Sequence, residues 1–176
     1  ISSFNKLETF WAIYQHLRKP DNCKFGTEIY LFVRDIKPLW EDPQNANGGK
    51  ISVRLRKKYT TIIWEELILG FIGEIFPPQI QSEITGLVIS IRRDCNLLQV
   101  WFKDYSYDKG VLIEDAIKQY LQIPENVDVE TKPFFKNYFG VPNNLSTEEK
   151  IKEKYSRKKS TNANNDNIGN INLKEN

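Results

Sequence analysis

The feature that most restricts the fold is the stretch from residue 36 to residue 50, which reads Ile-Lys-Pro-Leu-Trp-Glu-Asp-Pro-Gln-Asn-Ala-Asn-Gly-Gly-Lys. It begins just after an apolar run and ends just before a run in which apolar and polar residues alternate. Its two prolines and its Gly48–Gly49 pair disfavour a regular helix or strand. The stretch is therefore predicted to be a loop that connects two strands.

This loop places Trp40 directly before Glu41, between two prolines that stiffen the backbone. One interpretation is a tryptophan packed against the core with a solvated acid beside it. The other is a binding loop, because a flat π face next to a carboxylate suits a planar ligand with two donors on one edge. Guanine is such a ligand, since its ring nitrogen and its exocyclic amine can both donate to one carboxylate.

The rest of the chain alternates between helical and strand patterns with short connections. Apolar spacing predicts helices over residues 2–18, 60–76 and 109–121, and strands over residues 28–33, 51–57, 84–92, 97–103 and 127–131. The expected N-caps are Ser2 or Ser3, Thr60 or Thr61, and Asp108. Because the connections are short, we expect an α+β fold in which an antiparallel sheet carries the helices on one face.

The first predicted helix has two apolar stripes where a helix on a sheet needs only one. The stripes are Phe4, Leu7, Trp11 and Tyr14, and Phe10, Ile13 and Leu17. Either one stripe is buried and the other meets a partner, or the core takes up both.

Composition restricts the function classes. The net charge is only +2, so any basic patch must be local. No run of apolar residues is long enough to span a membrane. The single histidine, His16, offers little basis for a zinc site or a histidine-based triad, and we expect no metal, no cofactor and no enzymatic activity. The two cysteines, Cys23 and Cys95, are expected to be free thiols, with a disulfide left open.

The chain is predicted to divide into a domain of residues 1–143 and a tail of residues 144–176. Residues 148–159 are charged, and a frayed helix is left open there. Residues 160–176 are rich in asparagine with few apolar residues, so they cannot offset the entropy of folding. We therefore expect the tail to be largely disordered.

Several separated motifs resemble one family. They are Glu-Thr-Phe-Trp-Ala-Ile-Tyr at 8–14, Ile-Lys-Pro-Leu-Trp-Glu-Asp at 36–42, Asn-Gly-Gly-Lys at 47–50, Trp-Glu-Glu-Leu-Ile-Leu-Gly-Phe-Ile-Gly-Glu at 64–74 and Gly-Leu-Val-Ile-Ser-Ile-Arg at 86–92. In this order and spacing they look like translation initiation factor 4E, which binds the messenger-RNA cap. The resemblance implies a curved antiparallel sheet backed by three helices, whose N-terminal strands would lie upstream of this chain.

The resemblance also implies roles for residues on two surfaces. Trp40 would stack on the 7-methylguanine, Glu41 would bind its Watson–Crick edge and Trp101 would lie near the added methyl group. Lys50 and Arg92 would bind the 5′ phosphate chain of the capped messenger RNA. On the opposite surface, an amphipathic helix of a scaffold initiation factor or an inhibitory protein would dock on a set of side chains from two helices: Leu7, Trp11, Glu66, Leu69 and Ile72.

The chain departs from the family pattern in ways that favour a second hypothesis. The first stacking aromatic would lie upstream of the chain, and Leu97 stands where a phosphate-binding lysine is common. Ile51 replaces a common tryptophan, and Glu65 replaces an apolar partner contact. These departures lean toward the homologous repressor branch that binds caps weakly, or toward a protein-interaction module that has lost cap binding. A cytoplasmic location is expected, with a nuclear one left open.

Overall fold

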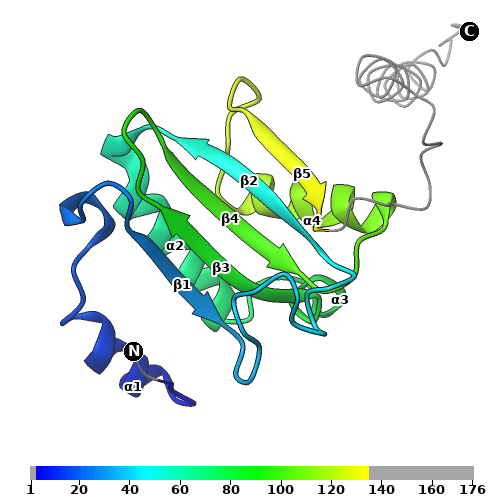
Figure 1. The fold of residues 1–176 in the computed structure, drawn as a ribbon, viewed down its shortest axis with the longest axis horizontal. Coiled ribbons are helices and arrows are strands. Elements are labelled where there is room, and N and C mark those ends of the chain that lie inside the picture. The colour runs from blue at the N-terminus through cyan, green and yellow to red at the C-terminus, as the bar shows by residue number, and fades with distance from the viewer. Residues whose placement is uncertain (1–2, 135–176) are drawn as a thin grey trace, which may run out of the picture. The chain divides into compact units, whose positions relative to one another are not determined.

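The computed structural model describes residues 3–134, so the predicted tail of residues 144–176 lies outside the described residues. The described chain forms a five-stranded antiparallel sheet in the order β1-β3-β4-β2-β5 (Figure 1). The helices are α1 (Leu7–Tyr14), α2 (Thr60–Ile72), the short α3 (Pro78–Gln81) and α4 (Tyr107–Tyr120). The strands are β1 (Glu28–Phe32), β2 (Gly49–Leu55), β3 (Ile84–Ser90), β4 (Asn96–Phe102) and β5 (Val129–Pro133).

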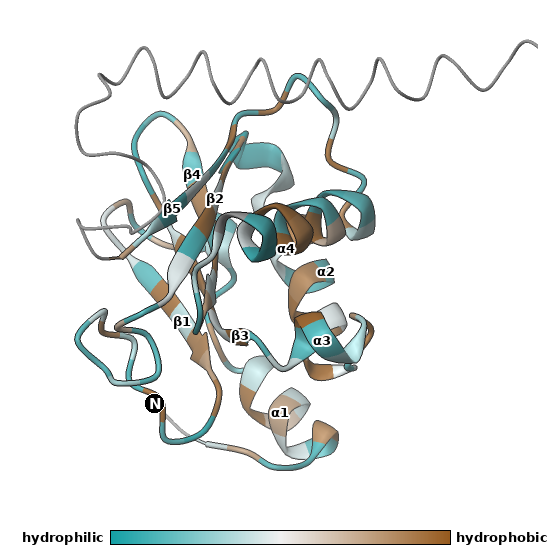
Figure 2. Cartoon of the chain, turned by 90° about the vertical axis from the view of Figure 1, so that its right-hand side faces the viewer, coloured by the Kyte–Doolittle hydropathy of each residue, from teal (hydrophilic) through white to brown (hydrophobic). Residues whose placement is uncertain are grey.

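All four helices lie on one side of the sheet, which confirms the predicted α+β layout (Figure 2). The alternation in β2 explains this arrangement. Ile51, Val53 and Leu55 are buried toward the helices, while Lys50 and Arg54 alternate with them and lie on the opposite face. The sheet therefore has one covered face and one open face.

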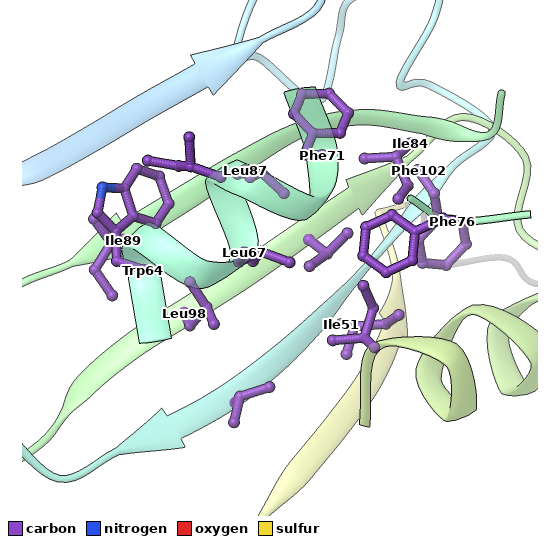
Figure 3. Packing of buried hydrophobic residues seen from close by; sticks show 14 of the residues in the cluster. Ile51, Trp64, Leu67, Phe71, Phe76, Ile84, Leu87, Ile89, Leu98 and Phe102 are labelled. Atoms are coloured by element: carbon purple, nitrogen blue, oxygen red, sulfur yellow. The ribbon is translucent and has the colours of Figure 1, made fainter. Parts of the chain in front are cut away.

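The core between the helices and the sheet is built largely from α2. Trp64 and Leu67 are almost completely buried and pack near Leu87 and Leu98 of the two central strands (Figure 3). Each such side chain contributes about 1.5–3 kcal/mol by leaving water. This packing fixes the central strands and hence the side chains that they carry on the open face.

The first helix is shorter than predicted. It spans Leu7–Tyr14 rather than residues 2–18, and Lys6 stands at its N-cap in an extended conformation without a side-chain bond. Ser3 lies before the helix, and Ser2 lies outside the described residues. Before the helix, the Phe4 ring contacts the Phe10 ring, with centroids 4.9 Å apart. Beyond Tyr14 the backbone bonds tighten to an i to i−3 pattern and the helix ends.

The buried face of α1 combines one residue from each predicted stripe. Phe10 and Tyr14, four positions apart, are buried, whereas Leu7 is 52% exposed and Trp11 is half-buried. The helix therefore covers the core with one face and leaves the other open.

The predicted caps of the other helices were wrong. Thr60 begins α2 but its hydroxyl Oγ1 accepts from Asn96 Nδ2 at 2.8 Å, so it ties the helix to β4 instead of capping it. At α4 the side chain of Ser106, not Asp108, accepts from the amide nitrogen of Lys109 at 3.3 Å. Helix α2 ends at Ile72, four residues earlier than expected, because the chain turns at Glu74, whose φ is 51°.

The thiols of Cys23 and Cys95 are both free. Within residues 3–134, no cluster of three or more histidine, cysteine or acidic side chains could bind a metal ion. The helices in that range are also too short or too polar to cross a membrane.

Candidate functional site

The loop between β1 and β2 is held together from inside by two polar side chains. Asn45 is fully buried, and its Nδ2 donates to the carbonyl oxygens of Lys37 and Leu39, both at 2.9 Å. The carboxylate of Asp42 accepts from the amide nitrogens of Lys37 and Gln44, each at 3.0 Å. These backbone bonds lower the pKa of Asp42, since they favour its charged form. The loop therefore has a defined shape without regular secondary structure.

This frame displays Trp40 and Glu41 on the surface. The Trp40 side chain is 56% exposed and Glu41 is also exposed. The interpretation in which Trp40 packs into the core is therefore wrong. Because tryptophan is a frequent anchor of binding surfaces, its fixed presentation on a braced loop favours a binding role.

The loop enters β2 through a contact that only glycine allows. A Cβ atom at Gly48 would lie 2.0 Å from the carbonyl oxygen of Phe102, well inside van der Waals contact. The amide of Gly48 also donates to the carbonyl of Asn45 at 2.7 Å. The close approach fixes where β2 starts, and so it fixes the position of Lys50.

Lys50 belongs to a straight row of residues across the open face of the sheet. The strand register pairs Lys50 with Trp101 on β4 and with Lys132 on β5. On the other side, Trp101 pairs with Gly86 on β3, which pairs with Phe32 on β1. The register thus places Trp101, Lys50 and Lys132 side by side on three neighbouring strands. These strands are β4, β2 and β5, and β2 begins where the Trp40 loop ends (Figure 1).

Trp101 is held in this row by contacts on several sides. Its indole nitrogen donates to Gln99 Oε1 at 3.1 Å, and its ring centroid lies 5.4 Å from that of Phe32 and 4.4 Å from that of Phe134. Only 8% of Trp101 is exposed. It is therefore less open to a ligand than the sequence-based role suggests, and the Phe134 ring covers part of it.

A carboxylate lies among the cations of the open face. Glu28 accepts hydrogen bonds from Ser90 Oγ, at 2.6 Å, and from the hydroxyl of Tyr30. These two bonds, with smaller contributions from Arg92 and Lys50, lower the pKa of Glu28. The same bond to Glu28 raises the pKa of Tyr30 to about 12. Sequence reasoning missed Glu28 and Tyr30, because a charged residue at a strand end carries no distinctive pattern.

The two expected phosphate ligands, Lys50 and Arg92, share this field. Burial lowers the pKa of Lys50 most, followed by the positive charges of Arg92 and Lys132, while Glu130 and Glu28 act in the opposite direction. Because Lys50 is partly buried close to other cations, an anion bound here would relieve their mutual repulsion. The structure therefore brings Lys50, Arg92 and Trp101 to one face of the sheet.

The residues of the expected partner surface lie on the other side of the molecule, on α1 and α2. Leu7 and Ile72 line one hollow of about 300 Å³ between these helices. Glu66 and Leu69 are exposed on α2. Beside them, Glu65 Oε1 accepts from Lys19 Nζ at 2.5 Å and from the Tyr14 hydroxyl at 3.1 Å, so it links α2 to the first helix. The departure at Glu65 thus has a structural role in this chain.

Comparison with known proteins decides the family. The sequence model of the eukaryotic initiation factor 4E family matches residues 1–164. This chain belongs to the initiation factor 4E family. The factor NCBP of Triticum aestivum is 35% identical over 134 residues, which cover 76% of this chain and 57% of that protein. The initiation factor 4E of Saccharomyces cerevisiae is 34% identical over 135 residues, 76% of this chain and 63% of that one. The chain thus spans about three fifths of the length of these curated relatives.

Solved structures of 4E-family proteins share the fold. Caenorhabditis elegans eIF4E-3, in complex with the 4E-binding protein Mextli and a cap analog, is 31% identical with a TM-score of 0.69, covering 74% of this chain and 76% of that one. Ascaris suum eIF4E-3, in complex with the m7G cap, is 28% identical with a TM-score of 0.72, covering 78% of each chain. The α+β sheet of this 4E-family chain is therefore that of proteins solved with a cap and with a 4E-binding protein.

Proposed function

We propose that this 4E-family chain binds the 7-methylguanosine cap of messenger RNA and links it to a scaffold protein in translation initiation. The observation that carries the proposal is the Trp40–Glu41 pair, exposed on a braced loop that leads directly to Lys50. Solved relatives in complex with cap ligands support it. A cytoplasmic location follows from this function.

The chemistry of the pair explains selectivity for the methylated base. Methylation at N7 makes the guanine cationic, and a cation over an indole face gains about 0.5–1 kcal/mol when exposed and about 2 kcal/mol or more when desolvated. Glu41 would accept from both donors on the Watson–Crick edge, as charge-assisted bonds. The uncharged base keeps the stacking but loses the electrostatic gain.

The phosphate chain would be held on the open face of the sheet. Lys50 and Arg92 would supply the positive charge there, and phosphate binding favours such side chains. Trp101 would support the base from the sheet, next to Lys50 in the cross-strand row.

Calorimetric titration with 7-methyl-GTP and with GTP tests this assignment. We expect 7-methyl-GTP to bind at least about tenfold more tightly than GTP, from the desolvated cation–π gain. Trp40→Ala and Glu41→Gln should each remove most of this preference. If Trp40→Ala binds 7-methyl-GTP as well as the unchanged chain does, the stacking assignment is wrong.

The scaffold would dock on the opposite surface, as an amphipathic helix against the open faces of α1 and α2. Leu7 and Leu69 are exposed apolar side chains there, and Trp11 and Ile72 are partly open. A helix that lays its apolar face on such a surface is a common mode of peptide recognition, with an aromatic such as Trp11 as anchor. Glu66, exposed on α2, would bind a donor from the helix.

A reciprocal experiment separates the two surfaces. Leu69→Glu should abolish capture of the 4E-binding region of Mextli and leave 7-methyl-GTP binding intact. Trp40→Ala should do the reverse. Loss of both activities in both variants would point to unfolding, which circular dichroism detects, and would argue against independent surfaces.

A second candidate function is a repressor or interaction module that binds caps weakly or not at all. Leu97 favours it, since this apolar residue lies between Ser90 and Arg54 in the strand register, where a cation would strengthen phosphate binding. Glu28 adds a negative charge to the same face. Failure of the chain to bind a 7-methyl-GTP resin, with Mextli capture intact, would favour this candidate.

A further inference from the structure

The open face of β5 borders the site and has no role in the assignments above. On this strand Val129 packs against the core and Thr131 donates to Glu114 of α4, so both side chains point toward the helices. Glu130, Lys132 and Phe134 alternate with them and therefore lie on the open face. This places a cation and an aromatic ring beside Lys50 and Trp101.

Lys132 is positioned to act on the same ligand as Lys50. The two residues are direct cross-strand partners, so their side chains leave the sheet next to each other. At this separation the positive charge of Lys132 helps to lower the pKa of Lys50, after burial and the charge of Arg92. Lys132 Nζ forms an exposed ion pair with Glu130 Oε1 at 2.7 Å, and such a pair is weak enough for a polyanion to replace it.

The strand on the other side of Lys50 offers no such charge. The outward residues of β4 are Leu97, Gln99 and Trp101, none of which is a cation. The positive charges that act on Lys50 therefore come from Lys132 on β5 and from Arg92, which follows β3.

Phe134 supplies an aromatic surface beside Trp101. The two ring centroids are 4.4 Å apart at 52°, the closest pair in this row of aromatic side chains. The backbone nitrogen of Phe134 donates to the carbonyl of Gly48 at 3.0 Å, which ties Phe134 to the end of the Trp40 loop. Trp101 is 8% exposed, so a ligand arriving at this corner meets the Phe134 ring together with the rim of the indole.

We propose that the open face of β5 is a wall of the cap site, on which Lys132 binds the phosphate chain beside Lys50 and Phe134 faces the charged base together with Trp101. This inference rests on the proposed cap binding. It adds Lys132 to Lys50 and Arg92 as a third cation for the phosphate chain.

The phosphate part is tested by titrating Lys132→Ala with 7-methyl-GTP and with 7-methyl-GMP. We expect about threefold weaker binding of 7-methyl-GTP, typical of one exposed ion pair, and a smaller change for 7-methyl-GMP. Glu130→Gln, which releases Lys132, should instead strengthen binding of 7-methyl-GTP. Lys58→Ala is the matched control, since Lys58 lies over the Tyr59 ring beyond the other end of β2 and its loss should change neither affinity.

The aromatic part is tested through selectivity. Phe134→Ala and Phe134→Leu should both lower the ratio of GTP to 7-methyl-GTP dissociation constants, by about twofold to thirtyfold, because neither has a π face. A ratio restored by leucine would mean that Phe134 only fills space, and would overturn this part. If the unchanged chain does not prefer 7-methyl-GTP, the proposed function itself fails. If it does and all β5 variants behave like Lys58→Ala, only the β5 inference fails.

Discussion

Replacing Asn45 with alanine should loosen the loop that displays Trp40 while the sheet stays folded. Asn45 Nδ2 makes two hydrogen bonds of 2.9 Å, to the carbonyls of Lys37 and Leu39. A hydrogen bond contributes about 0.5–1.5 kcal/mol net, so losing both costs about 2 kcal/mol. The Oδ1 atom of Asn45 has no partner among the described residues, so its removal breaks no further bond.

The effect on binding follows from the same free energy. If the 2 kcal/mol acts on the local equilibrium between braced and open loop, affinity for 7-methyl-GTP falls by up to about thirtyfold. Urea unfolding followed by circular dichroism gives the change in stability, and calorimetry gives the change in affinity. We expect the free energy of unfolding and the affinity for 7-methyl-GTP to decrease together.

Asn47→Ala is the matched control for this variant. Asn47 is exposed in the same loop and its backbone carbonyl accepts from Tyr105, a bond that the substitution leaves in place. We expect Asn47→Ala to resemble the unchanged chain in both measurements. If Asn45→Ala also matches the unchanged chain, within about 0.5 kcal/mol in stability and twofold in affinity, internal bracing of the loop is not what presents Trp40.

Three further outcomes follow from single contacts. The pKa of Glu28 is lowered by its bonds to Ser90 and Tyr30, so ionised Glu28 stabilises the fold above the usual carboxyl pKa and stops doing so as the pH falls through the lowered value. In urea unfolding at about pH 6 and pH 3.5, Glu28→Gln should therefore lose less free energy of unfolding on acidification than the unchanged chain does. Gly48→Ala should lower the free energy of unfolding by at least about 2 kcal/mol in the same assay, because its Cβ would lie 2.0 Å from the Phe102 carbonyl oxygen. In the control Gly26→Ala the Cβ meets nothing within 4 Å and bears only the strain of a φ of 85°, so equal losses of stability in the two variants would refute the clash. Thr60→Val should cost about 1–3 kcal/mol, since it leaves the buried Asn96 Nδ2 without its acceptor, and an unchanged unfolding midpoint would contradict this bond.

The fold was largely predictable because its signals are local and repeated. Alternation predicted a strand over residues 51–57, and β2 is observed at Gly49–Leu55, two residues earlier at each end, so that Lys50 lies within it. The proline-marked loop separated it from β1. The caps at Thr60 and Asp108 could not be predicted, because their outcome depends on partners distant in sequence or on a one-residue choice between adjacent polar side chains. Residue type alone did not distinguish Ser106 from Asp108 as the cap of α4, since serine and aspartate are both favoured N-caps.

The site was predictable only in part, for a related reason. Trp40 and Glu41 stand out in sequence because a stiffened loop with an indole is uncommon. Asn45 does not, since asparagine is frequent in any loop, and its role depends on which carbonyls it reaches after folding. Lys132 lies on β5 and Phe134 directly follows it, and no local pattern specifies the register of this strand to β2.

The register of β2 connects the stability of this chain to its proposed binding chemistry. Ile51 and Val53 are at most 1% exposed, and Lys50 alternates with them. A slip by one residue would bury Lys50 and expose both apolar side chains, at a cost of several kcal/mol. The core therefore selects the register in which Lys50 lies between Trp101 and Lys132. Because the packing on the covered face already determines this placement, the cations and rings of the open face can differ between 4E-family members without a change of fold.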